Sequence, residues 1–285
     1  IDAINALAGN LDAPGGAMFA KAAAFATNTA GTAGVGNGVV TGRYHSRVSG
    51  APEVMGQFPM ACLAEEIDSG DEGRLRALIM VASNASVSAP NSPRLAKALE
   101  SLDFLVCLDI YVNETTRHAD VIIPGPSPLE EAHYDVFFSQ FASRNVARYS
   151  PPALPLPDGM PRDWETMLRL VAIVSGRGAS ASLEALDDEL TAGMLRARAP
   201  EHVDATLAAT GARRGPERLI DLALRSGPYG DMFGLRPGGL SLDALLAAPS
   251  GIDYGPLEPR VPEVLRTPSG KIELAPPDFV AELAV

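Results

Sequence analysis

Residues 75–124 read LRALIMVASNASVSAPNSPRLAKALESLDFLVCLDIYVNETTRHADVIIP, and this stretch decides the fold. Three runs, at 75–82, 104–108 and 121–123, are apolar, with Arg76 as the one charged residue among them, as in strands that are covered on both faces of a sheet. Short polar or helical connections separate them. Strands linked in this way lie parallel with right-handed crossovers. The sequence therefore predicts an α/β fold with a doubly wound, mostly parallel sheet and a helical insertion.

Helices are predicted before, between and after these strands in the sequence. Ser92 followed by Pro93 is typical of a helix start, with the Ser92 hydroxyl as the cap. Residues 60–70 form a short helix that Gly70 ends. Asp163 begins a further helix, and we expect Trp164 to pack that helix onto the sheet. The aromatic segment 134–149 is either a strand and hairpin or an irregular packed segment.

Composition divides the chain into four parts. Residues 1–59 form a connecting segment rich in Gly and Ala that opens with a short amphipathic helix. Within it, GTAGVGNG at 31–38 lacks the glycine spacing of a dinucleotide fingerprint and is predicted to be a surface loop. Residues 60–176 form the α/β core and residues 177–260 a helical subdomain. Residues 261–285 are expected to contain a turn and a strand that lead toward another unit.

Charge and cysteine usage exclude several classes of protein. The net charge of −12 argues against a nucleic-acid-binding protein, which normally carries a basic face. No apolar run reaches the length of a membrane span, and no signal peptide is visible, so we expect a cytoplasmic protein. Cys62 and Cys107 lie far apart and form no C-x-x-C pair. That spacing excludes an iron–sulfur cluster or a zinc ribbon built from this chain alone.

Five blocks resemble the molybdopterin-dependent oxidoreductases, the group of formate dehydrogenases, nitrate reductases and dimethyl sulfoxide reductases. The loop at 83–90 is similar to the family's G-x-N-P-x-x-S-x-P pattern. The block at 109–124 is similar to D-x-F-x-x-E-T-x-x-x-A-D-V-x-L-P. AGNLDAPGGAMF at 8–19, PRDWE at 161–165 and TPSGKIEL at 267–274 resemble flanking segments of the family in the same order.

The chain also departs from the family pattern. Ser83 and Ala85 stand in place of the Gly and Pro of G-x-N-P. After Glu130 the usual E-x-x-G-T-x-x-N-x-E-G-R is replaced by EEAHYDVFFSQFASRN, which indicates a divergent subfamily with an altered substrate-side loop. Against the family pattern the chain lacks the amino-terminal cysteine cluster, the molybdenum-ligating residue and the C-terminal capping domain. Residues 261–285 would lead into that missing domain.

The resemblance implies a cofactor site made of six residues. A pterin guanine dinucleotide is long and polyanionic, and small residues between a strand and a helix start suit its phosphates. Asp109, at a strand end, is placed to accept from guanine or from a ribose hydroxyl. Two alternatives stay open: Asp109 ends a strand in solvent, and Glu114 with Thr115 caps a helix. The expected cofactor-binding residues are Ser83, Asn84, Ser88, Asp109, Glu114 and Thr115.

The expected function follows from this resemblance. The chain would be an internal fragment that contributes the α/β wall of the cofactor site. The full-length enzyme would carry molybdenum on the pterin, with an iron–sulfur cluster outside this chain, and would oxidise or reduce a small formate- or nitrate-like substrate. We expect no catalytic residue, no metal ligand and no tightly bound cofactor in the fragment alone. Its partners would be the rest of the polypeptide and electron-transfer subunits.

Two other functions compete with this one. The same fold occurs without molybdenum as a scaffold in the large iron–sulfur subunit of respiratory NADH–quinone oxidoreductases. The altered loop after Glu130 favours that scaffold, whereas the intact block around Asp109 and Glu114 disfavours it. A free-standing nucleotide-binding α/β protein is the third hypothesis, and the missing glycine-rich fingerprint argues against it.

Overall fold

The computed structural model describes residues 1–25, 41–197 and 200–283. The loop predicted at 31–38 lies outside these residues. The chain divides into two units, each described here by itself. The sheet unit comprises Asn37–Glu130 and Pro155–Arg162, and the helical unit comprises Ile1–Gly36, Glu131–Leu154 and Asp163–Val285.

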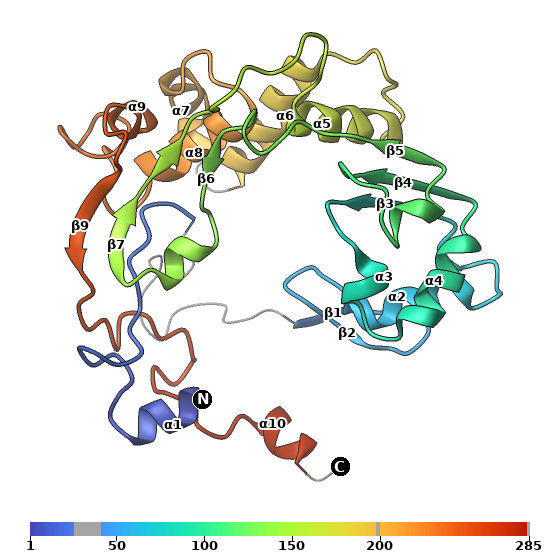
Figure 1. Ribbon diagram of the computed structural model, residues 1–285. Coiled ribbons are helices and arrows are strands. Elements are labelled where there is room, and N and C mark those ends of the chain that lie inside the picture. Colours follow the sequence, from blue (N-terminus) through green and yellow to red (C-terminus); the bar gives the residue numbers. More distant parts are fainter. Residues whose placement is uncertain (26–40, 198–199, 284–285) are drawn as a thin grey trace. The chain divides into compact units, whose positions relative to one another are not determined.

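Three parallel strands form the centre of the sheet unit (Figure 1). They are β3 (Ala77–Val81), β4 (Phe104–Leu108) and β5 (Val121–Ile123), in the order β3-β4-β5. Met80 lies opposite Cys107, and Cys107 lies opposite Ile122. The parallel sheet confirms the predicted α/β class. β4 and β5 have the predicted bounds, whereas β3 begins after Arg76 and ends one residue before the end of the predicted run at 75–82.

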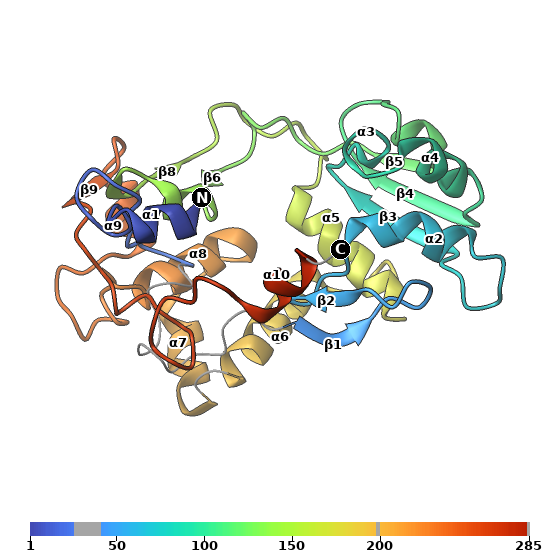
Figure 2. The same cartoon turned by 90° about the horizontal axis from the view of Figure 1, so that it is seen from below.

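The helices of the sheet unit pack on one face of this sheet (Figures 1 and 2). Leu105 and Cys107 of β4 share a buried cluster with Ile67, Leu95 and Leu99, all at most 1% exposed. This cluster holds the strands on their helices. The elements are η1 (Met60–Cys62), α2 (Leu63–Asp68), α3 (Ala85–Ser88), α4 (Ser92–Glu100) and η2 (Thr116–His118).

The predicted cap of α4 is wrong. Ser92 is the first residue of the helix, and the residue before it, Asn91, has a left-handed backbone with φ 55°. The Ser92 hydroxyl donates to the carbonyl of Ala89 at 3.3 Å. Pro93 still lies in the first turn, where its missing N–H removes no helical hydrogen bond.

A two-stranded hairpin completes the sheet unit, and one buried carboxylate pins it. β1 (Thr41–His45) pairs antiparallel with β2 (Pro52–Val54). Glu53 is 1% exposed. Its oxygens accept from the Arg43 amide and Nε, both at 3.2 Å, and from the Gly56 amide. The Arg43 guanidinium, aided by these amides, lowers the pKa of Glu53 to about 2.

This lowered pKa predicts an acid-dependent loss of stability. In the unfolded chain Glu53 would titrate near 4.5, above its folded value, so its stabilising effect is complete above about pH 4.5 and disappears as the pH falls toward 2. We expect the urea midpoint of the sheet unit to fall across this window. Glu53→Gln should lower the midpoint at pH 7 and flatten its acid dependence. An equally steep acid dependence in the variant would contradict this assignment.

Helices dominate the helical unit. Its core contains Leu224, Leu242 and Leu245, packed with Ala147 and Tyr149. The helices are α1 (Asp2–Leu7), α5 (Asp163–Val174), α6 (Leu183–Arg196), α7 (Val203–Ala209), α8 (Gly215–Arg225), α9 (Leu242–Leu246) and α10 (Pro277–Glu282), with η3 (Phe138–Phe141) and η4 (Pro200–His202). Among the described residues none of these helices is both long and apolar enough to cross a bilayer.

The aromatic segment 134–149 contains both strands and a helical turn, so each alternative held in part. β6 (His133–Tyr134) pairs antiparallel with β8 (Tyr149–Ser150). β7 (Arg144–Ala147) pairs antiparallel with β9 (Ile252–Pro256), about a hundred residues further along the chain. Residues 135–143 between them hold the helical turn η3.

One local prediction in this unit is wrong, and another is correct only in part. The Trp164 ring lies against Gly215 at the start of α8, so close that a Cβ on Gly215 would come within 2.6 Å of it. The missing side chain of Gly215 makes that space, and Trp164 thus packs its helix on another helix. The turn predicted within 261–285 is present at 267–270, where the Gly270 amide donates to the Thr267 carbonyl at 2.9 Å, but no strand follows it among the described residues.

Candidate functional site

Two loops meet at the carboxyl-terminal edge of the parallel sheet, and three side chains tie them together. Asn84, after β3, donates from its side-chain amide to the Glu114 carboxylate at 2.7 Å. The Thr115 hydroxyl, in the loop after β4, donates to the Asn84 amide oxygen at 2.8 Å. The same hydroxyl accepts from the Ser86 backbone amide at 2.9 Å. The two loops therefore hold one another in a fixed relation.

Thr115 has a positioning role in this arrangement. Its side chain is 0% exposed, and its hydroxyl already donates and accepts within the protein. Asn113 fixes the residue in place, because its side-chain oxygen accepts from the amides of Thr115 and Thr116 at 3.0 Å each. A buried hydroxyl with both partners satisfied cannot touch a ligand directly. Its role can only be to hold the Asn84 side chain and the Ser86 amide in position, so that neighbouring groups of the same loop can contact a ligand.

Asp109 closes the turn that leads out of β4. One carboxylate oxygen accepts from the Tyr111 amide at 3.0 Å and the other from the Asn113 side chain at 3.0 Å. A carboxylate oxygen has room for a further hydrogen bond, and Asp109 is half-buried. The geometry gives Asp109 a turn-forming role and leaves it able to accept from a ligand as well.

The loop after β3 presents donors that have no partner among the described residues. Ala82 turns the chain with a positive φ of 46°. The backbone amides of Ser83 and Asn84 then make no hydrogen bond within the described part of the chain, and the buried Ser86 hydroxyl has none either. Ser88 is exposed, and its hydroxyl donates to the Asn84 carbonyl at 3.1 Å. Unpaired amides and hydroxyls at the end of a parallel strand suit a phosphate.

Glu114 supplies the negative charge of the site. Its side chain is exposed, and the hydrogen bond from Asn84, helped by nearby Arg117, lowers the pKa of its carboxyl below its usual range. It is therefore ionised at neutral pH and can accept N–H donors from a base.

A rim of exposed apolar side chains beside the site was not expected from the sequence. Ile110, Tyr111 and Val112 are 49%, 70% and 77% exposed. The sequence does contain a signal for this rim, namely the apolar run IYV directly after the polar end of β4, where a surface loop would normally be polar. Exposed aromatic and aliphatic groups beside a polar site are typical of a ligand pocket.

All six residues predicted from the sequence thus lie in the two loops at this edge of the sheet. Asn84, Glu114 and Thr115 contact one another, and Asp109 joins them through Asn113. In the described residues no cluster of three or more His, Cys, Asp or Glu side chains could hold a metal ion. The edge is suited to an organic anion with a hydrogen-bonding base.

Comparison with known proteins gives one family and several relatives. The sequence model of the molybdopterin oxidoreductase family matches residues 4–153. The assimilatory nitrate reductase catalytic subunit of Bacillus subtilis is 31% identical over 126 residues, which are 44% of this chain and 16% of that protein. The F420-dependent formate dehydrogenase subunit alpha of Methanocaldococcus jannaschii is 40% identical over 63 residues, 22% of this chain and 9% of that protein.

A third relative is another formate dehydrogenase subunit. The F420-dependent formate dehydrogenase 1 subunit alpha of Methanococcus maripaludis is 30% identical over 105 residues, 37% of this chain and 15% of that protein. The chain thus matches less than a fifth of the length of each of these three relatives.

Proposed function

The chain belongs to the molybdopterin oxidoreductase family, and from this premise we propose that its sheet unit binds part of a pterin guanine dinucleotide. The loop at 83–88 would receive phosphate groups, and Glu114 would accept from the guanine base. The observation that carries the proposal is the pair of unpartnered amides at Ser83 and Asn84, beside a carboxylate held in place by Asn84. Anion donors and a base acceptor then lie in the same two loops.

The residues present fit such a cofactor in their hydrogen-bonding groups and in size. Small side chains at Ser83, Ala85 and Ser86 let phosphate oxygens approach the backbone, and the carboxylate of Glu114 matches the N–H donors of guanine. Asp109 would add a second acceptor, and Tyr111 an apolar surface for a ring. Thr115 and Asn84 would keep both loops in the binding geometry.

In the full-length enzyme this chain would contribute one wall of the cofactor site. The bound molybdenum would supply the electron or oxygen-atom transfer, and a small formate- or nitrate-like molecule would be the substrate. This substrate class is proposed because the relatives include nitrate and formate enzymes. An iron–sulfur cluster, electron-transfer subunits and the metal ligand would lie outside these 285 residues, and the fragment alone would be inactive.

Glu114→Gln in the full-length enzyme tests the proposed base contact. Glutamine keeps an oxygen for Asn84 but loses the charge, and a hydrogen bond to a charged group contributes about 1.5–3 kcal/mol, or roughly 10- to 100-fold in affinity. We expect the variant to retain less cofactor than the wild type after dialysis against a limiting concentration of cofactor. The cofactor content is measured as pterin fluorescence per protein.

Asp103→Asn is the matched control, because Asp103 lies at the opposite end of β4 and pairs with Arg74 at 2.8 Å. It should leave the cofactor content unchanged. Equal cofactor retention by wild type and Glu114→Gln would contradict the contact.

The scaffold remains a second candidate because of one observation. Both carboxylate oxygens of Asp109 accept hydrogen bonds within its own turn, so Asp109 has a structural role that needs no ligand. A scaffold predicts that the full-length protein, purified from cells that make the cofactor, contains no pterin. The binding function predicts that this site holds about one dinucleotide in each protein molecule.

A further inference from the structure

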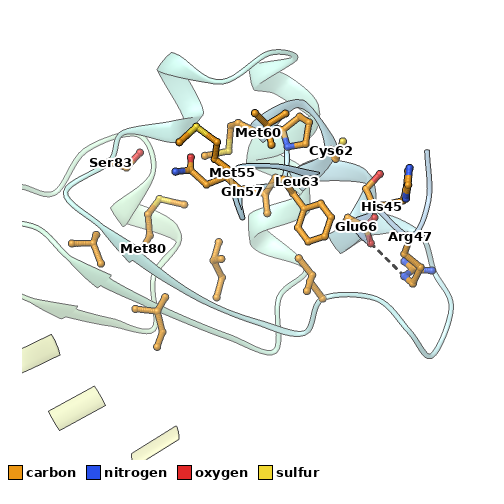
Figure 3. A pocket seen from close by; sticks show the side chains of 18 of the residues that line it. His45, Arg47, Met55, Gln57, Met60, Cys62, Leu63, Glu66, Met80 and Ser83 are labelled. Carbon is orange, nitrogen blue, oxygen red and sulfur yellow. Dashed lines mark ion pairs between the residues drawn. The ribbon is translucent and has the colours of Figure 1, made fainter. Parts of the chain in front are cut away.

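A groove with a volume of about 1100 Å³ runs beside β3 in the sheet unit (Figure 3). Its lining is mainly apolar and includes Met55, Met60 and Met80, and the guanidinium of Arg47 pairs with Glu66 at 3.3 Å. No described residue that lines this groove has a buried polar side-chain atom without a hydrogen-bond partner. The groove therefore presents no group that requires a polar ligand.

A smaller cavity in the helical unit does present such groups. Its volume is about 180 Å³, and it is lined by residues of β6, η3 and β7 together with Arg148. For comparison, a cavity of about 150 Å³ in a protein core can hold one benzene molecule. The space is therefore sufficient for a small organic molecule.

Two hydroxyl groups at this cavity have no hydrogen-bond partner among the described residues. Tyr134 is 7% exposed, and both its hydroxyl and that of Ser139 are shielded from solvent and unpaired. Burying a hydroxyl without a hydrogen bond is unfavourable, and most buried polar groups have a partner. Burial, together with Tyr254 and Asp135, raises the pKa of Tyr134 to about 12, so its hydroxyl keeps its proton and can donate.

Arg148 adds a positive charge to these two hydroxyls. Its side chain is exposed, and among the described residues its guanidinium has no ion pair or hydrogen bond. The carboxylate of Asp135 also lies at the cavity, but its Oδ1 accepts from the amides of Phe137 and Phe138 at 3.2 and 2.6 Å and so holds the turn η3 in place. The free groups of the cavity are therefore hydrogen-bond donors.

Apolar side chains form another wall of the cavity and continue beyond it. Phe138 and Val146 line the cavity, and they are 68% and 37% exposed. Phe137 and Phe141, 64% and 73% exposed, extend this surface, because the Phe137 ring lies 5.4 Å from that of Phe138 and 5.7 Å from that of Phe141. Exposed apolar clusters of this kind mark interaction or ligand sites. The cavity thus combines free donors with an apolar surface.

We propose that this cavity binds a small carboxylate with an apolar body. The carboxylate would accept from the hydroxyls of Tyr134 and Ser139 and pair with Arg148, while the apolar body would lie on Phe138. A carboxylate offers only acceptors, and hydrogen bonds to it are stronger than those between neutral groups. The proposal does not rest on cofactor binding, because the cavity belongs to the helical unit and the cofactor loops belong to the sheet unit.

Titration calorimetry of the full-length protein with benzoate tests this site. Benzamide is the neutral counterpart of benzoate, and acetate has the carboxylate without the ring. We expect a dissociation constant for benzoate of about 1 mM or lower, and binding of benzamide and acetate that is about tenfold weaker or more. Tyr134→Phe and Arg148→Met should each weaken benzoate binding about tenfold or more, because each removes a hydrogen bond to a charged group.

Arg144→Met is the matched control, since Arg144 pairs with Asp253 at 2.8 Å and does not line the cavity. It should leave the affinity for benzoate unchanged. Tyr134→Phe should retain the full pterin content, whereas Glu114→Gln should bind benzoate like the wild type, so the two binding proposals fail separately. Equal benzoate affinity in the wild type and Tyr134→Phe, or equal affinity for benzoate and benzamide, would overturn the carboxylate site.

Urea unfolding without ligand shows whether the Tyr134 hydroxyl already has a partner. Tyr134→Phe removes only this hydroxyl, and removing an unpaired buried hydroxyl should leave the urea midpoint unchanged or raise it. Benzoate should raise the midpoint of the wild type more than that of the variant. A clear fall in the midpoint of ligand-free Tyr134→Phe, with no benzoate binding to the wild type, would mean that ordered water is the partner and would contradict the proposal.

Discussion

Thr115→Val is expected to reduce the cofactor content of the full-length enzyme by about tenfold or more, although Thr115 would not touch the cofactor. Valine has nearly the same shape but no hydroxyl. The buried Ser86 amide then loses its acceptor at 2.9 Å, and the Asn84 side chain loses its donor at 2.8 Å. Leaving such buried groups unpaired costs about 1–3 kcal/mol, and 1.4 kcal/mol corresponds to tenfold in binding.

The effect should come from the position of Asn84 and not from general unfolding. Thr115→Ser keeps the hydroxyl and should restore most of the cofactor content, whereas Thr115→Val should not. Far-ultraviolet circular dichroism should be the same for both. If Thr115→Val retains the wild-type amount of pterin, then the link between the two loops has no part in binding.

Arg218→Leu should destabilise the helical unit by about 3–5 kcal/mol, because it removes one partner of a buried ion pair. The Arg218 side chain is 2% exposed. Its Nη1 lies 3.1 Å from an Asp187 carboxylate oxygen and 2.6 Å from one of Asp188, and its Nε donates to the Arg213 carbonyl at 2.8 Å. The variant would leave the carboxylate of Asp187, 9% exposed, without this cation.

Urea unfolding followed by circular dichroism measures this loss. In the wild type the Gly215 amide lies 3.2 Å from both carboxylate oxygens of Asp187. Adding Asp187→Asn to Arg218→Leu removes the unpaired charge and keeps one side-chain oxygen that accepts from this amide. The double variant should recover part of the stability. A single-variant loss below about 1 kcal/mol would place Arg218 among weakly coupled surface pairs.

The strands of the sheet unit were predictable because their signal is local. The runs at 75–82, 104–108 and 121–123 are apolar apart from Arg76, and each is followed by a polar residue or a proline. The pairing of β7 with β9 was not predictable, since it joins segments about a hundred residues apart whose local patterns are weak. The same is true of Trp164, whose packing partner Gly215 is distant in the sequence.

The candidate site was predictable as a set of residues but not as a division of roles. The sequence placed Asn84, Asp109, Glu114 and Thr115 at one edge of the sheet. It could not show that Thr115 is fully buried or that Asp109 has both oxygens in a turn, because burial and hydrogen-bond direction depend on how the two loops meet.

Amide hydrogen exchange of the full-length enzyme, with and without its pterin cofactor, tests the central claim most directly. The unpartnered amides of Ser83 and Asn84 should become protected about tenfold or more when the cofactor is bound, since they would then donate to its phosphates. Amides at the opposite end of the sheet, at 101–103, should not change. Equal exchange at Ser83 and Asn84 in the loaded and the empty enzyme would contradict the account.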